Sequence, residues 1–523
     1  MLFNSYEFIY LFLPVTLAVF FLIGKRGHHR IAISWLVAAS LFFYGWWNPA
    51  YLGLVLISML FNYAVGVSLA SQHRSVVKSQ ILTLGIACNL GLLGYYKYAN
   101  FFVENLNKVA GSDFNLETII LPLAISFFTF QQIAYLVDAY KGETREYNFL
   151  HYCLFVTFFP QLIAGPIVHH KEMLPQFARD WIYRLSYENI AVGMTIFSLG
   201  LFKKVVLADG VSIYATPVFD ASEAGIALTF FEAWTGALAY TLQLYFDFSG
   251  YSDMAIGLAR MFGIRLPLNF SSPYKAKNII EFWRCWHMTL SRFLRDYLYI
   301  PLGGNRKGTG RRHVNLMLTM LLGGLWHGAG WTFVIWGGLH GMYLIINHMW
   351  HATKRSLGMN DRESFWFGKV FARLLTFSCI VMAWVFFRAD SLDGAVNISW
   401  AMIGGNGISL PPSVGGRMMS MAPWLAQWGV SFEGMFSNGL MLFNDGLILI
   451  AGLLLVVWCA PSTQQMIYRY EPALEVYSGE IRAPGYAWFA WKPNWIWMGG
   501  VMCMLLYSLY SMQNKSEFLY FQF

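Results

Sequence analysis

Two histidines lie in stretches rich in tryptophan, and the stretch around His327 is uncharged and also rich in glycine. His327 belongs to LLGGLWHGAGW (residues 321–331), and His287 belongs to EFWRCWHMTLSR (residues 281–292). An imidazole titrates near neutral pH, so it can take a proton from a hydroxyl nucleophile and return it to a leaving group. Both histidines are therefore candidates for transfer chemistry. From position alone, a histidine that only hydrogen-bonds between helices explains each equally well.

The second stretch carries further polar residues at helical spacing. Arg284, His287 and Ser291 fall at i, i+3 and i+7, so a continuous helix would place them on one face. Such a face can bind an anionic group, for example a coenzyme phosphate, beside His287. We expect residues 276–300 to form an interfacial helix, because they mix aromatic and charged side chains. In the alternative interpretation, the arginines only anchor the protein at the headgroups.

Three more residues are weighed as parts of a site. Trp326 precedes His327 and is a candidate for contacting the donor or the acceptor. Asp247 and Asp253 interrupt the apolar stretch 243–257, where they can orient a histidine, carry protons or pair with an arginine. Structural pairing is the preferred interpretation, and Asp253 is kept as a second binding candidate. His340 is set aside, since 13 residues along one helix would place it off the face of His327.

The surrounding composition is that of a membrane protein. Of the 523 residues, 57% are apolar and only 12% are charged. Uncharged runs reach the length of about 20 residues that a spanning helix needs. They predict an all-α, polytopic membrane protein with about 11 to 13 membrane segments. These runs are 8–24, 31–72, 79–96, 118–137, 147–170, 313–353, 374–387, 446–460 and 495–510.

The run that holds His327 is the longest one with a candidate site. Residues 313–353 form a stretch of 41 residues without Asp, Glu, Lys or Arg. Only about 13 residues separate His313 from His327, which is too short for a full pass. We therefore expect a broken or re-entrant segment, which membranes tolerate where it is buried in protein or lines a cavity.

Charge and cysteine usage narrow the class of protein further. The net charge of +8 is concentrated in residues 260–312, which hold eleven Lys and Arg against two acids. This local concentration does not indicate a nucleic-acid-binding protein. Basic loops near the N-terminus alternate with acidic ones, and the positive-inside rule places the N-terminus outside the cytoplasm. The six cysteines stand singly in apolar runs, which indicates buried hydrophobes and neither disulfides nor metal ligands. We expect no metal site.

No low-complexity linker or fixed-period repeat divides the chain. A single membrane domain over residues 1–523, with a motif core at 243–341, is the simplest organisation. The longest candidates for segments outside the membrane are 171–188, 388–445 and 461–494, which we expect to be surface loops and short interfacial helices.

Taken in order, the motifs resemble the membrane-bound O-acyltransferase (MBOAT) superfamily. The resemblance is to the bacterial branch that contains the alginate O-acetylation membrane protein and the D-alanyl transfer protein of teichoic acids, and it spans nearly the whole chain. The motifs that carry it are FLPV (12–15), GYYKYANFF (94–102), LPLAISFFTFQQIAYLVD (121–138), FFPQLIAGPIV (158–168), QLYFDFSGYSDMAIGLA (243–259), EFWRCWHMTLSRFLRDYLYIPLGGNR (281–306), GGLWHG (323–328) and FLYFQF (518–523).

The resemblance implies both a fold and an activity. It implies a helical domain with a funnel through a bacterial inner membrane, a catalytic histidine at His327 and a second motif histidine at His287. The implied donor is a cytoplasmic acyl thioester, acetyl-CoA for this branch, with no bound cofactor. The implied acceptor is an extracytoplasmic polysaccharide such as alginate.

Delivery to that acceptor would require a separate periplasmic acetyltransferase, because the chain has no hydrolase-like domain with a serine nucleophile. One residue departs from the family pattern, since Cys285 stands where a second arginine is common. A thioester on this cysteine is conceivable, but a small buried hydrophobe is the better interpretation.

Two other functions remain open at this stage. D-Alanyl transfer to teichoic acid, or acetylation of peptidoglycan or cellulose, would keep the fold and change the cargo. A proton-coupled transporter of a polysaccharide precursor would use Asp247, Asp253 and the histidines as a relay. The chain shows no inverted repeat, which disfavours the transporter.

Overall fold

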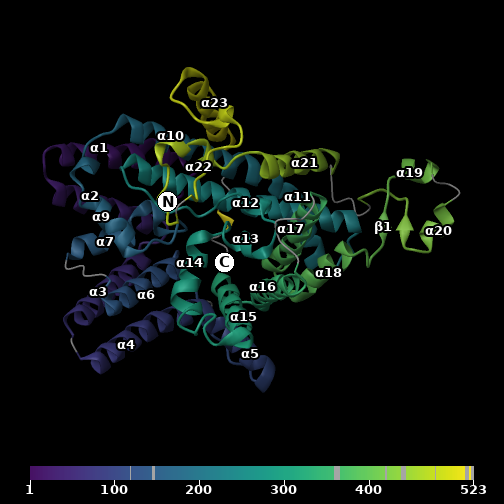
Figure 1. The fold of residues 1–523 in the computed structure, drawn as a ribbon, viewed down its shortest axis with the longest axis horizontal. Coiled ribbons are helices and arrows are strands. Elements are labelled where there is room, and N and C mark those ends of the chain that lie inside the picture. The colour runs from purple at the N-terminus through teal and green to yellow at the C-terminus, as the bar shows by residue number, and fades with distance from the viewer. Residues whose placement is uncertain are drawn as a thin grey trace.

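The computed structural model is almost entirely helical and confirms the all-α prediction (Figure 1). The structure describes residues 1–72, 74–117, 119–143, 148–358, 366–417, 421–436, 443–477, 479–512 and 518–519. Within these ranges, the strands are β1 (Ile408–Ser409) and β2 (Val430–Ser431), which pair in parallel. Residues 520–523 of the terminal FLYFQF motif lie outside the described part of the chain.

Several helical segments are suited to crossing a membrane. By length and composition, five in the described residues can do so: Phe8–Lys25, Ala50–Ser71, Ser75–Ala110, Tyr187–Glu223 and Trp366–Arg388. The chain is thus a multi-pass membrane protein. These segments are fewer than the 11 to 13 expected, because some uncharged runs fold into helices too short to cross. The run 147–170, for example, divides into α7 (Phe149–Thr157) and α8 (Phe159–Leu162).

The N-terminal third follows the predicted runs closely. The run 31–72, which is long enough for two passes, forms two helices because Pro49 and its neighbours interrupt it. The helices of this third are η1 (Phe8–Phe12), α1 (Leu13–Lys25), α2 (His29–Gly45), α3 (Ala50–Ser71), α4 (Ser75–Leu93), η2 (Gly94–Tyr98), α5 (Ala99–Ala110) and α6 (Ile125–Lys141).

Two helices cross at the centre of the fold with their backbones in contact. Helix α12 (Phe230–Met261) is 32 residues long and buried over most of its length (Figure 1). Its partner α10 (Tyr187–Phe202) continues through η4 (Lys203–Ala208) into α11 (Asp209–Glu223). A Cβ atom at Gly200 would lie 2.6 Å from the carbonyl oxygen of Gly250. Glycine at this crossing therefore sets the spacing of the two helices.

A helical hairpin carries His327 at its turn. Helix α15 (Gly308–His327) ends at this histidine, and α16 (Trp331–Ser356) returns beside it. A side chain at Gly324 or Gly337 would collide with the opposite helix, so these glycines allow the close packing. The expected interruption is found at His327. The segment before it is an unbroken helix of 20 residues, because the helix begins at Gly308 among basic residues.

Four helical segments in the described residues widen into a π-helix, which inserts an extra residue into one turn. They are η1, η2, η4 and η6 (Arg295–Tyr299). Three of the four carry basic residues. Lys97 lies in η2, and Lys203 and Lys204 lie in η4.

The remaining helices are short or lie in the C-terminal third. Figure 1 shows β1, α19 and α20 projecting at one end of the molecule. The helices are α9 (His170–Phe177), η3 (Asp180–Tyr183), η5 (Pro273–Lys275), α13 (Ile279–Trp283), α14 (Met288–Leu294), α17 (Trp366–Arg388), α18 (Leu392–Met402), α19 (Pro412–Arg417), α20 (Ala422–Ala426), α21 (Phe443–Cys459), α22 (Thr463–Met466), η8 (Tyr468–Tyr470), η9 (Ala487–Phe489) and α23 (Trp495–Ser511).

Candidate active site

His327 is the last residue of α15 and is only 5% exposed. The last carbonyls of a helix have no partner within it. Here the last two residues of η2, Lys97 and Tyr98, supply hydrogen-bond donors to these carbonyls. The Nζ atom of Lys97 donates to the carbonyl oxygens of Trp326 (2.6 Å) and His327 (3.0 Å), and the Tyr98 hydroxyl donates to that of Leu325 (2.8 Å). These bonds fix the end of the helix and the backbone of His327.

Two tryptophans connect three buried histidines. The Trp326 ring centre lies 5.0 Å from that of His327 and 6.3 Å from that of His287. The Trp336 ring centre lies 5.1 Å from His327 and 4.8 Å from His340. We call these five residues the histidine centre. The reason for setting His340 aside is wrong. It placed His340 and His327 on one helix, whereas His327 ends α15 and His340 lies on α16.

His287 occupies a break in the chain and not the middle of a helix. Its φ of 41° and ψ of 54° are left-handed, and it precedes α14. The prediction of a continuous helix over 276–300 is therefore wrong, and Arg284 and Ser291 do not share a helical face with His287. The His287 ring is fully buried against Phe248, with the ring centres 4.8 Å apart. Its Nδ1 atom lies 3.0 Å from the Oδ1 atom of Asn269.

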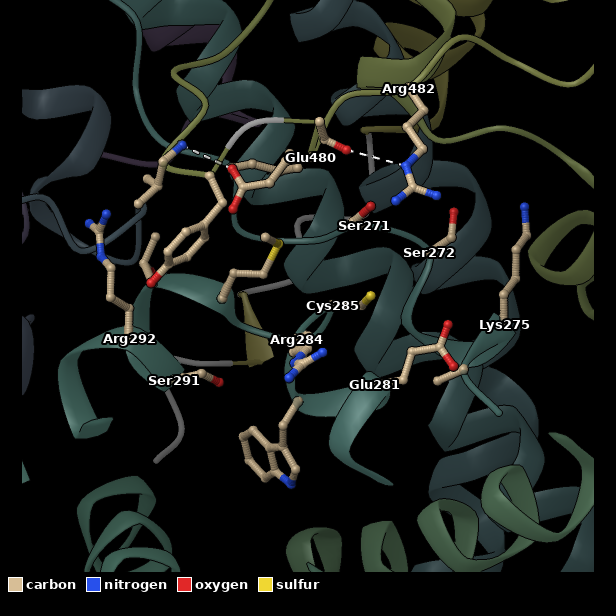
Figure 2. A pocket seen from close by; sticks show the side chains of 18 of the residues that line it. Ser271, Ser272, Lys275, Glu281, Arg284, Cys285, Ser291, Arg292, Glu480 and Arg482 are labelled. Atoms are coloured by element: carbon tan, nitrogen blue, oxygen red, sulfur yellow. Dashed lines mark hydrogen bonds between the residues drawn. The ribbon is translucent and has the colours of Figure 1, made fainter. Parts of the chain in front are cut away.

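A cleft of about 910 Å³ lies beside this break (Figure 2). Arg284 and Ser291 line it, as do Cys285, Met288 and Thr289, which flank His287 in sequence. None of the three histidines lies in the cleft wall. The structure therefore separates the predicted residues into the cleft, which holds Arg284 and Ser291, and the histidine centre, which holds His287, Trp326 and His327.

The cleft is lined by more cations than anions. Its wall contains two acids, Glu281 and Glu480, and five cations, Lys275, Arg284, Arg292, Arg295 and Arg482. Arg292 and Arg295 are engaged, because Arg292 binds Glu172 at 2.6 Å and Arg295 binds Asp296 at 2.7 Å. Burial raises the pKa of Glu480. Arg284 is exposed in the cleft (Figure 2), and it forms no ion pair with the residues that the structure describes.

Comparison with known proteins places this site in a family. A sequence profile of the membrane-bound O-acyltransferase family matches residues 139–387. The peptidoglycan O-acetyltransferase of Helicobacter pylori is 48% identical over 437 residues, which cover 78% of this chain and 81% of that protein. The chain belongs to the membrane-bound O-acyltransferase family. It is an O-acyltransferase, as the motifs predicted.

Two further relatives show the range of the family. The probable alginate O-acetylase AlgI of Pseudomonas aeruginosa is 44% identical over 411 residues, covering 77% of this chain and 74% of that protein. The teichoic acid D-alanyltransferase of Streptococcus thermophilus is 26% identical over 317 residues, covering 56% of this chain and 74% of that protein.

The buried carboxylates of Asp247 and Asp253 are held in ion pairs in this acyltransferase. Asp253 accepts from Lys203 at 2.6 Å and also from the side chains of Thr463 (2.6 Å) and Gln464 (2.5 Å). Asp247 pairs with Lys204 at 2.8 Å. The structural pairing weighed from the sequence is present, with lysine in place of arginine. Asp253 lies outside both the cleft wall and the histidine centre.

Cys285 does not have the surroundings of a nucleophile. Burial, followed by the charge of Glu281, raises the pKa of its thiol to about 11. A thiol with this pKa stays protonated at neutral pH, and the thiolate is the reactive form.

Trp336, Lys97 and Asn269 were not identified from the sequence as residues of the site. Lys97 had a visible signal, since it is a lone lysine in the apolar motif GYYKYANFF, where a charge is costly without a partner. Asn269 had none, because it lies 18 residues before His287 in an irregular segment.

Proposed function

We propose that this O-acyltransferase moves an acetyl group from a cytoplasmic thioester, acetyl-CoA, to an extracytoplasmic polysaccharide such as alginate or peptidoglycan. The observation that carries the proposal is the histidine centre buried next to a cation-rich cleft. The names of the relatives support the cargo, since the Helicobacter protein is called a peptidoglycan O-acetyltransferase and the Pseudomonas protein an alginate O-acetylase.

In the proposed reaction His327 acts as general base. It removes the proton of an acceptor hydroxyl while the hydroxyl oxygen attacks the carbonyl carbon of the thioester. The new C–O bond forms, the C–S bond breaks, and the proton passes to the departing thiolate. His287 either polarises the carbonyl or holds the acceptor, and Trp326 separates the two imidazoles.

The cleft is the proposed entrance for the donor. Its excess of positive charge suits the phosphates of a coenzyme, and Arg284 is placed to bind one of them. Ser291 is the second proposed contact. The acetyl group would then reach the histidine centre past Cys285, Met288 and Thr289, which separate the cleft from His287.

The acceptor side is proposed to involve a second protein. A periplasmic acetyltransferase would complete delivery to the polymer. This requires the protein to sit in the bacterial inner membrane with its N-terminus in the periplasm, as the alternation of charged loops predicts.

The transporter is disfavoured by the contacts of its proposed relay. Asp247 and Asp253 each bind a lysine at close range, and Asp253 accepts two further hydrogen bonds. A carboxylate held in this way is a poor proton carrier. D-Alanyl transfer and cellulose acetylation would keep the same fold and change the transferred group or the acceptor. No feature of the described site favours either of them.

One experiment tests the proposed function directly. Inside-out membrane vesicles carry the protein and enclose its periplasmic partner and polysaccharide fragments, and radiolabelled acetyl-CoA is supplied from outside. We expect labelled polysaccharide with the native chain and none with His327→Ala. His28→Ala is the matched control, since His28 is exposed before α2 and should leave transfer unchanged. Transfer by the His327 variant at normal protein level would refute the assignment, and counterflow of polysaccharide without any thioester would favour the transporter.

A further inference from the structure

The side-chain oxygen of Asn269 contacts both His287 and Thr289. The Oδ1 atom of Asn269 lies 3.0 Å from His287 Nδ1, 2.9 Å from the hydroxyl of Thr289 and 3.4 Å from the backbone nitrogen of Thr289. Asn269 is fully buried, and so is His287. The hydroxyl of Thr289 also accepts the backbone N–H of Ile167 at 3.0 Å.

These contacts decide which atoms carry protons. A backbone N–H can only donate, so the atom of Asn269 that faces Thr289 is the carbonyl oxygen and not the amide nitrogen. An oxygen acceptor requires a proton on His287 Nδ1. In a neutral imidazole the other nitrogen, Nε2, then carries a lone pair and accepts hydrogen bonds.

The local backbone keeps this arrangement in place. The N–H of Met288 donates to the carbonyl oxygen of Asn269 at 2.9 Å, and the N–H of Ser271 donates to that of Cys285 at 3.0 Å. The two segments are therefore bonded on both sides of His287, whose left-handed conformation turns its ring toward Asn269. Phe248 packs on the ring from another helix, with 4.8 Å between the ring centres.

We propose that Asn269 is a positioning residue that holds His287 as a neutral imidazole with its proton on Nδ1, so that Nε2 accepts a hydrogen bond from the acceptor hydroxyl. This inference rests on the proposed function, in which His287 serves the transfer. It also decides between the two roles left open for His287. An Nε2 atom without a proton cannot polarise the thioester carbonyl, so His287 holds the acceptor.

The test compares two substitutions at one position. Asn269→Leu keeps the size of the side chain and removes the acceptor, so we expect kcat to fall about ten- to a hundredfold with little change in KM for the donor. Asn269→Asp keeps an oxygen acceptor for His287 and Thr289. We expect it to retain most of the activity near pH 8, and to move the acidic limb of the pH profile to higher pH, because a carboxylate stabilises the protonated imidazole.

Two further variants separate this inference from the proposed function. Asn315→Leu is the matched control, since Asn315 is also a fully buried asparagine and donates to the carbonyl oxygen of Gly304; its pH profile should match that of the native chain. His287→Ala should abolish transfer. If it does while Asn269→Leu is as active as the native chain, the inference is overturned and the function stands. Equal loss in Asn269→Leu and Asn269→Asp, with an unshifted pH profile, would also overturn it. A fully active His287→Ala would instead refute the role of His287 in the proposed function.

Discussion

Lys97 offers the sharpest test of how the fold presents His327. Lys97→Met keeps the length of the side chain and removes the donor to the carbonyl oxygens of Trp326 and His327. Each buried acceptor left without a partner costs about 1–3 kcal/mol. Since the end of a helix can partly relax, we expect a local loss of about 3 kcal/mol. That corresponds to about a hundredfold fall in the ratio of ordered to disordered helix end.

Two assays measure the consequence of this change. The rate of acetyl transfer should fall at least about tenfold, because the reacting imidazole is the residue at the disordered end. The Tm in detergent micelles should drop by a few degrees. Lys108→Met is the control, since Lys108 is exposed and its ion pair with Glu104, one turn away at 2.8 Å, is exposed too; it should change stability by less than about 0.5 kcal/mol. A Lys97 variant with a native rate and an unchanged Tm would refute the reasoning.

Three other predictions concern the cleft. Arg284→Ala should raise KM for the donor about tenfold and leave kcat nearly unchanged, as the loss of one charged phosphate contact predicts; a change confined to kcat would contradict this role. In a chain whose only cysteine is Cys285, alkylation should accelerate about tenfold per pH unit up to about pH 11, and a plateau near pH 8.5 would contradict the raised pKa of this thiol. Glu172→Gln leaves the buried Arg292 charge uncompensated and should cost about 3–5 kcal/mol in thermal unfolding, whereas Glu143→Gln, at an exposed pair with Lys171, should cost less than about 1 kcal/mol.

Hydrophobic runs were enough to predict the helical class and much of the N-terminal third. Uncharged stretches of spanning length have few alternatives in a bilayer, so α1, α2 and α3 fall close to their predicted limits. The number of segments was less predictable. An apolar run can also fold into short buried helices, as α7 and α8 do, and length alone does not separate the two outcomes.

The candidate site was predictable where residue type alone marks it. His327 and His287 stand out because a buried ionisable group needs a reason. The spacing argument failed at both, since it assumed that each helix continues. α15 ends at His327, and the chain breaks at His287, so residues placed by helical phase lie elsewhere. Asn269 reaches His287 only through tertiary structure.

The widened turns around the buried lysines have a consequence for how this fold changes over time. A π-helical turn is what remains when one residue is added to a helix whose two ends stay anchored. Removing one residue from η2 or η4 would restore a regular helix between the same two ends and change the direction of the side chains within that turn. Lys97 would then turn away from the carbonyl oxygens of Trp326 and His327, and Lys204 from Asp247. Single-residue gaps at these two segments should therefore coincide with loss or replacement of the lysines among related sequences.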